Sequence, residues 1–163
     1  MANEKETKNK KEVKNKKSFF KDFKAELKKD DARFVNRSLQ MIEFEREMYK
    51  NPDRDLKSLW RELKQKYLHR GDETESNNEW ATIPHYLSHP GYYQNYFRAG
   101  LIKAQLYNAM ISELGEISKN SKTSNYLNEK LFKFGSSKDD AELIMKITGK
   151  TLSEDDFCNR IIK

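Results

Sequence analysis

The chain has 163 residues, of which 36% are hydrophobic and 36% charged, and a formal net charge of +6. This length suits one domain with one modest core, and a mean hydropathy of −1.04 excludes a hydrophobic membrane span. A single cysteine, Cys158, excludes an internal disulfide, and no apolar run follows the basic N-terminus, so we expect a cytoplasmic protein.

The positive charge is concentrated at the start of the chain. Residues 1–30 contain eleven lysines and six acidic residues, so they carry +5 of the net +6. We therefore expect residues 1–31 to form a lysine-rich, largely disordered tail, in which Phe19, Phe20 and Phe23 begin a short helix that docks on the folded region, 32–163. Such a tail could bind nucleic acid by counterion release. No aromatic or Gly-Arg pattern supports base contact, so a solvated extension is favoured.

Two helices are predicted next along the chain. Residues 32–50 carry Val35, Leu39 and Ile42 at helical spacing. Pro52 ends this helix, because proline disfavours helix at the residue before it. Asp55 is placed to cap a second helix over residues 56–68. The apolar stripe of that second helix is Leu56, Leu59, Trp60, Leu63 and Tyr67.

The segments 71–78 and 80–91 are predicted as irregular, and a long helix follows over 92–115. Ala99, Gly100 and Ala104 give that helix a small-residue face for close packing. Three shorter helices are predicted after it, at 124–134, at 138–148 with Ser136 and Asp139 as its cap, and at 153–162. No segment alternates with a period of two, so the sequence predicts an all-α fold.

The chemistry-bearing side chains gather around residues 83–96. His85 precedes a helix start at which Tyr92, Tyr93 and Tyr96 are spaced to share faces. If the loop folds back, the imidazole and the phenols converge as hydrogen-bond donors to a tetrahedral oxyanion. The same spacing also suits an aromatic cluster that holds the loop on the helix, and on spacing alone this second interpretation is favoured.

The sequence predicts no metal site in this segment. His85 and His89 have the i, i+4 spacing of an H-E-x-x-H motif, but Tyr86 stands where the glutamate belongs. Pro90 moves His89 out of helical geometry. Elsewhere, we expect the alternating acids at 43, 45 and 47 to lie on a solvated helix face, and Cys158 to be a buried or idle thiol.

Four sequence blocks resemble the C-terminal part of helical zinc oligopeptidases, the group that includes angiotensin-converting enzyme, thimet oligopeptidase and oligoendopeptidase F. The blocks are F-E-R-E-M-Y with N-P over 44–52, L-K-S-L-W to K-Y over 56–67, H-x-x-x-x-P-x-Y-Y-x-N-Y over 85–96, and Gly135 with Leu143, Thr148-Gly149 and Phe157. The resemblance implies an all-α helical bundle equivalent to the C-terminal part of a zincin-like oligopeptidase domain.

The resemblance also implies roles for the clustered residues. His85 and Tyr96 would contact the scissile peptide and stabilise the tetrahedral intermediate, and Tyr92 or Tyr93 would line the same cleft. The zinc motif of the group does not occur in this sequence, so we expect no cofactor bound by this chain. Two positions depart from the pattern: Asp140 replaces a tryptophan, and Arg98 interrupts a small apolar run.

We therefore expect a fragment or truncated homologue of a zinc metallopeptidase that is inactive alone. Its expected partners are a peptide or a complementary zinc-bearing polypeptide, with self-association through exposed apolar helix faces as a further expectation. A non-enzymatic helical peptide-binding or interaction module is the alternative. A basic nucleic-acid-associated protein is the least favoured.

Overall fold

The computed structural model describes the backbone of residues 2–70 and 77–162, and the side chains of 21–70 and 77–162. These residues form helices and no strand, so the all-α prediction is confirmed. The α-helices are α1 (Ala2–Lys50), α2 (Leu56–Leu68), α3 (His85–Ser88), α4 (Tyr93–Leu114), α5 (Lys122–Lys130), α6 (Asp140–Thr148) and α7 (Asp155–Ile162), and two 3-10 turns are η1 (Glu79–Thr82) and η2 (Phe132–Phe134).

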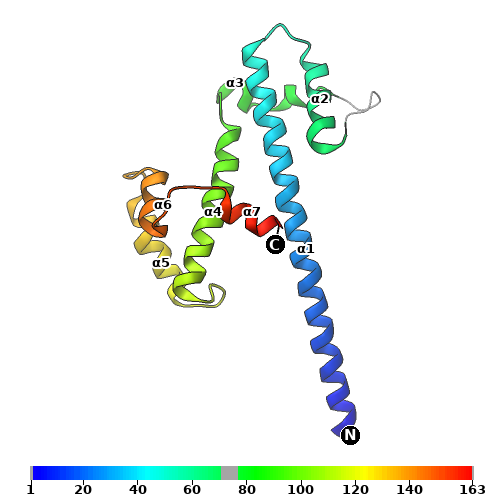
Figure 1. The fold of residues 1–163 in the computed structure, drawn as a ribbon, viewed down its shortest axis with the longest axis vertical. Helices are drawn as coiled ribbons and strands as arrows, with labels where there is room; N and C mark the ends of the chain where they lie inside the picture. The colour runs from blue at the N-terminus through cyan, green and yellow to red at the C-terminus, as the bar shows by residue number, and fades with distance from the viewer. Residues whose placement is uncertain (1, 71–76, 163) are drawn as a thin grey trace.

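The architecture is built on one long helix, α1 (Figure 1). At 1.5 Å per residue its 49 residues span about 74 Å. α2 runs back along the C-terminal half of α1, and α4 lies on another side of the same half (Figure 1). α7 packs on both α1 and α4, whereas α5 and α6 pack on α4 away from α1.

The N-terminal segment differs from its prediction. Where the sequence indicates a largely disordered tail, the backbone is helical from Ala2 and continues without a break through residue 31. Phe23 is 51% exposed on this helix, whereas the side chains of Phe19 and Phe20 lie outside the described residues. The division of the chain into a tail and a folded region at residue 31 stays a prediction.

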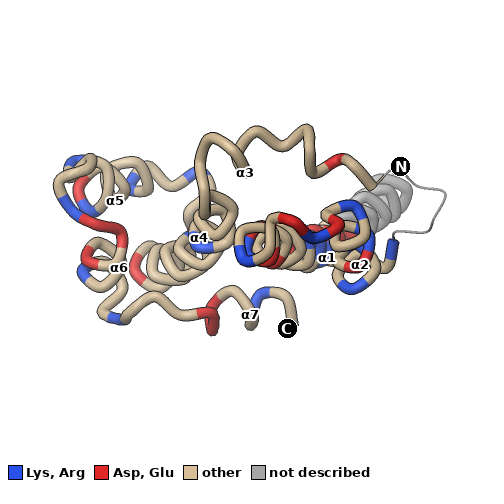
Figure 2. Tube along the Cα trace, turned by 90° about the horizontal axis from the view of Figure 1, so that it is seen from above, with Lys and Arg blue, Asp and Glu red and all other residues tan. Residues whose placement is uncertain are grey.

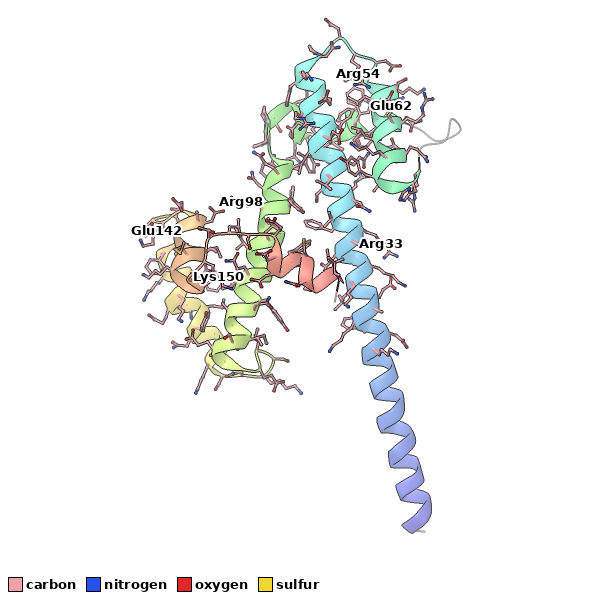
Figure 3. The ribbon with its side chains drawn as sticks, viewed as in Figure 1. Arg33, Arg54, Glu62, Arg98, Glu142 and Lys150 are labelled. Atoms are coloured by element: carbon pink, nitrogen blue, oxygen red, sulfur yellow. The ribbon has the colours of Figure 1, made fainter. Side chains whose placement is uncertain are left out.

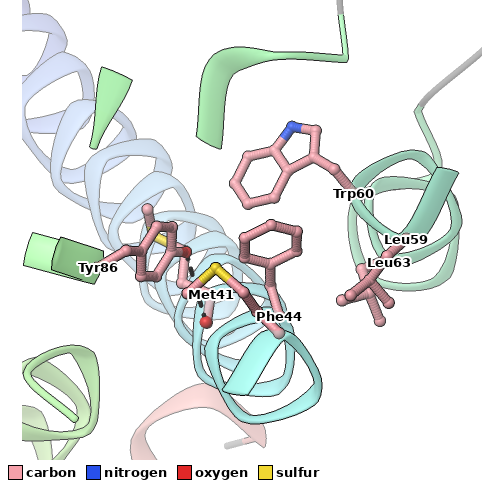
Figure 4. Close-up of a cluster of buried hydrophobic side chains, with 7 residues drawn as sticks. Met41, Phe44, Leu59, Trp60, Leu63 and Tyr86 are labelled. Atoms are coloured by element: carbon pink, nitrogen blue, oxygen red, sulfur yellow. Dashed lines mark hydrogen bonds between the residues drawn. The ribbon is translucent and has the colours of Figure 1, made fainter. Parts of the chain in front are cut away.

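The core lies between α1, α2 and the segment that follows α2. The ring of Phe44 is fully buried, with its centroid 4.9 Å from that of Trp60 and 5.3 Å from that of Tyr86 (Figure 4). Met41, Met48, Leu59 and Leu63 complete this cluster. The α2 stripe is confirmed, since Leu59, Trp60 and Leu63 are buried and Leu56 and Tyr67 pack against them.

The buried face of α1 is not the one that the sequence indicates. Val35, Leu39 and Ile42 are only half-buried, whereas Met41 and Phe44 point into the core. The apolar residues of α1 occupy two sides of the helix, so their spacing alone leaves its orientation open. The aromatic contacts of Phe44 with α2 and α3 decide it.

Most helix ends follow their local signals. Asp55 accepts hydrogen bonds from the backbone N–H groups of Lys57 and Ser58, which caps α2 as predicted. Gly149 ends α6 in the left-handed conformation, with φ +72°. The N-cap of α6 is Asp139 and not Ser136, because the Asp139 carboxylate accepts the backbone N–H of Glu142.

The junction of α1, α4 and α7 depends on close approach at Gly100. A Cβ atom at this position would lie 3.0 Å from the ring of Phe34 and 3.6 Å from that of Phe157. Beside it, the guanidinium of Arg160 donates through Nε and Nη2 to the buried carboxylate of Asp31, at 2.7 and 2.6 Å. The predicted small-residue face is correct for Gly100 and Ala104, whereas Ala99 is exposed.

The two residues that depart from the family pattern contact each other. Arg98 donates to both carboxylate oxygens of Asp140, at 2.6 and 2.8 Å, and thereby ties α4 to α6. Arg98 lies on the flank of α4 beside α6 (Figure 3). A charged pair therefore stands at the position where the resemblance leads us to expect apolar packing.

Acidic and basic residues are mixed over the described helices, as Figure 2 shows. Within residues 2–70 and 77–162, no helix is both long enough and apolar enough to cross a membrane.

Candidate functional site

The segment before α4 makes two turns that position its imidazoles and phenols. Pro84 precedes the single turn of α3 with φ −65°, a value to which its ring restricts it. His85 is the first residue of α3, and His89 leaves the helix with φ −143°. Gly91 then takes φ +75°, a left-handed conformation that glycine adopts without strain, and the chain turns into α4.

These turns bring His85 and the three predicted tyrosines together. The ring of His85 stacks on Tyr92 with centroids 4.6 Å apart and planes within 8°. The hydroxyl of Tyr93 lies 3.4 Å from Nδ1 of His85, and the ring of Tyr96 stands edge-on to the imidazole at 6.4 Å. Tyr92 and Tyr93 also each contact Tyr96, so both line the same cluster.

This cluster, His85 with Tyr92, Tyr93 and Tyr96, is open to solvent on one side and supported by the core on the other; we call it the phenol wall. Tyr96 is 44% exposed, whereas His85, Tyr92 and Tyr93 are half-buried. Tyr86 is turned the other way, and its hydroxyl donates to the carbonyl of Met41 inside the core. The wall therefore contains four aromatic groups, of which three are phenols that can donate a proton.

Two phenols of the wall, Tyr93 and Tyr96, have a pKa above the usual value and keep their protons at neutral pH. Burial raises the pKa of the Tyr93 hydroxyl, and the neighbouring Tyr96 raises it further. Loss of solvation also raises the pKa of Tyr96, with a further contribution from the Tyr92 hydroxyl. Protonated phenols at neutral pH are hydrogen-bond donors, which is the state that a negatively charged oxygen requires of them.

A buried glutamate on α1 supports the wall, and the sequence interpretation missed it. Glu45 was expected on a solvated face, yet it is 5% exposed and its Oε1 accepts the backbone N–H of Gly91 at 2.6 Å. One turn later Tyr49 donates its hydroxyl to the carbonyl of Tyr86. Because Gly91 is 46 residues from Glu45, no local pattern in the sequence indicates this contact.

The other expectations for isolated residues have mixed outcomes. Glu43 is partly buried, and its carboxylate binds Lys66 and the Tyr67 hydroxyl rather than facing only solvent. Cys158 is exposed on α7.

The described side chains do not fit a zinc site. A catalytic zinc ion needs three protein ligands that converge on one point. Within residues 21–70 and 77–162, no group of three His, Cys, Asp or Glu side chains could hold a metal. Nδ1 of His85 faces Tyr93 and Nδ1 of His89 lies 2.8 Å from the Ser88 hydroxyl, so both imidazoles contact hydroxyl groups.

A comparison with protein-family models shows to which family the chain belongs. Residues 40–163 match the model of the carboxypeptidase Taq (M32) metallopeptidases, which is more than half of the chain. The chain belongs to this M32 family. No curated protein and no solved structure matches it.

The M32 assignment confirms the expected metallopeptidase relationship in part. The matching model is that of carboxypeptidase Taq and not that of the angiotensin-converting enzyme, thimet oligopeptidase and oligoendopeptidase F group, so the narrower assignment is not supported. The matched residues include the phenol wall, Glu45 and all of α2. Residues 2–39 of α1 precede the match.

Proposed function

We propose that this M32 chain supplies the peptide-binding and oxyanion-stabilising wall of a metallopeptidase cleft. His85 and Tyr96 contact the scissile peptide group, and Tyr92 and Tyr93 line the cleft beside them. The observation that carries the proposal is the convergence of one imidazole and three phenols within a single half-exposed cluster.

The chemistry of the wall suits the tetrahedral state of peptide hydrolysis. As a peptide carbonyl is attacked, its oxygen gains negative charge, and donors fixed in advance stabilise that charge at little cost in reorganisation. The raised pKa values of Tyr93 and Tyr96 keep both hydroxyls protonated, and the stack of His85 on Tyr92 limits the rotation of both rings. Glu45 and Tyr49 hold the backbone of the segment from behind.

The zinc ligands of the cleft are proposed to come from a complementary zinc-bearing segment outside these 163 residues. The 163 residues alone are then expected to bind peptides without hydrolysing them. The alternative, a helical module that only binds peptides, uses the same wall and differs in lacking a zinc-bearing partner.

The binding role is tested by removing one hydroxyl. A peptide with a phosphinate at the position of the scissile bond mimics the tetrahedral oxyanion, and Tyr96→Phe removes one donor to it. A hydrogen bond to a charged group contributes about 1.5–3 kcal/mol, so the affinity should fall at least about tenfold. The affinity for the plain peptide should change much less.

Tyr107→Phe is the matched control. Tyr107 also lies on α4 and is 50% exposed, but it is outside the wall. Equal losses for the two variants, or no preference of the parent chain for the phosphinate, would contradict the proposed role of Tyr96.

The dependence on a second polypeptide is tested by activity and metal content. We expect the purified chain to retain no stoichiometric zinc after dialysis and to leave peptides intact. Tight zinc binding together with hydrolysis that stops on chelation would show that the chain is a complete enzyme and would overturn this part of the proposal.

A further inference from the structure

A second concave site lies away from the phenol wall, where the end of α2 meets the middle of α1. It is an open groove of about 460 Å³, lined by Arg33, Asn36 and Arg37 from α1 and by Tyr67, Leu68, His69 and Arg70 from the end of α2. We call it the arginine pocket. Arg33 lies on the flank of α1 below α2 (Figure 3). Its volume is within the range of small-ligand sites.

The end of α2 directs Arg70 into this pocket. His69 takes the left-handed conformation, and the backbone N–H groups of His69 and Arg70 both donate to the carbonyl of Lys64. This turn stops the helix beside α1. Arg70 therefore lines the same cavity as Arg37, which is 33 positions earlier in the chain.

The charges of the lining are incompletely balanced. Arg33 is paired with Glu26 and Asp30, at 3.1 and 2.7 Å. Arg37 lies over the ring of Trp60, 5.8 Å from its centroid, and among the described side chains it donates to the amide oxygen of Gln40. The side chain of Arg70 has no acidic partner among the described residues.

The carboxylate of Glu43, at the rim of the arginine pocket, does not neutralise Arg37 or Arg70 either. Glu43 contacts the hydroxyl of Tyr67 at the rim, but it also holds the ammonium group of Lys66 at 2.8 Å. The guanidinium groups of Arg37 and Arg70 thus line the same pocket, and neither forms an ion pair with a carboxylate of the described residues. Guanidinium groups bind the oxygens of carboxylates and phosphates through pairs of parallel hydrogen bonds.

We propose that the arginine pocket binds a compact oxyanion, a phosphate or a carboxylate group, between the guanidinium groups of Arg37 and Arg70. The aromatic contact with Trp60 holds the Arg37 guanidinium in place before the anion arrives. The proposal does not rest on the peptidase role: none of the lining residues belongs to the phenol wall, and Arg37 acts on the wall only through its charge near the Tyr93 hydroxyl.

The test is a titration of the full chain with inorganic phosphate and, separately, with acetate at constant ionic strength. Binding is followed through the backbone amide shifts of His69 and Arg70. We expect saturable shifts with at least one of the two anions, and the arm that saturates identifies the ligand class. Arg70→Glu should weaken that binding by at least about tenfold.

Lys103→Glu is the matched control, since it makes the same change in charge at an exposed position of α4. It should leave the affinity nearly unchanged, and Arg37→Lys should weaken binding although it keeps the charge. Failure of both anions to saturate, or an equal loss in Lys103→Glu, would overturn the proposal. Neither result would bear on peptide binding at the phenol wall.

Discussion

At the scale of single residues, Glu45 links the core to the phenol wall. Its carboxylate is almost completely buried and accepts the N–H of Gly91, the residue whose left-handed conformation starts α4. A buried donor that loses its acceptor costs the free energy of its desolvation. The position of Tyr92 and Tyr93 therefore depends on a side chain of α1 that is not itself a member of the wall.

Two replacements of Glu45 should distinguish the loss of its hydrogen bond to Gly91 from the loss of its negative charge. Glu45→Ala leaves the Gly91 N–H unsatisfied and should lower the free energy of unfolding by about 1–3 kcal/mol. Glu45→Gln keeps an acceptor oxygen and should lower it less. Urea unfolding measures both variants, and the aromatic NMR shifts of His85 and Tyr92 report whether the stack is kept. Equal stability of the alanine variant and the parent would contradict the supporting role.

At the scale of helices, the contact between α1, α4 and α7 is fixed by the absence of a side chain. Gly100 lets the rings of Phe34 and Phe157 approach the α4 backbone. Glycine inside a helix costs about 1 kcal/mol relative to alanine, so its place here is explained by packing and not by helix propensity. The Arg160–Asp31 pair holds α7 on α1 next to this contact.

A larger residue at Gly100 should therefore be destabilising. Gly100→Leu places atoms inside the contact distance of Phe34, and overpacking of this kind costs about 1–3 kcal/mol. Ala99→Leu, one position earlier on the exposed side of α4, is the control and should stay within about 0.5 kcal/mol of the parent. Thermal unfolding compares the two. A Gly100→Leu chain as stable as the control would mean that α7 does not pack against α4 as closely as described.

At the scale of the whole molecule, several helix ends could be predicted from local signals, whereas the burial of some side chains could not. Pro52, Asp55 and Gly149 act on the backbone within a few residues, and the ends of α1, α2 and α6 follow from them. The buried face of α1 and the burial of Glu45 depend on Phe44 meeting Trp60 and on Gly91 lying beside α1. These contacts join distant parts of the sequence, and periodicity contains no information about them.

The functional sites, too, could be predicted from the sequence only where their residues are close together in the chain. His85 and its three tyrosines could be grouped from sequence because they lie within twelve residues and one turn brings them together. The arginine pocket joins Arg37 to Arg70 through the antiparallel packing of α2 on α1, and no spacing in the chain indicates that pair.

The fold as a whole should lose stability in alkaline solution through its buried phenols. Burial raises the pKa of Tyr86 far above its usual value of 10.0, and burial also raises that of Tyr93. The folded state therefore keeps these protons at a pH where the unfolded chain releases them. The stabilisation from Tyr86 is fully present below about pH 10 and declines above it by at most about 1.4 kcal/mol per pH unit, and the half-buried Tyr93 adds a smaller contribution of the same sign.

Tyr86→Phe isolates the largest contribution to this decline. The variant cannot ionise at this position and loses only a long hydrogen bond, 3.4 Å, to the Met41 carbonyl. Its free energy of unfolding, measured in urea between about pH 9 and about pH 11, should fall less steeply than that of the parent chain. Tyr107→Phe, which removes an exposed phenol, should fall as steeply as the parent. Identical slopes for all three chains would show that the Tyr86 hydroxyl is accessible to solvent, and Tyr86 would then not belong to the core that supports the phenol wall.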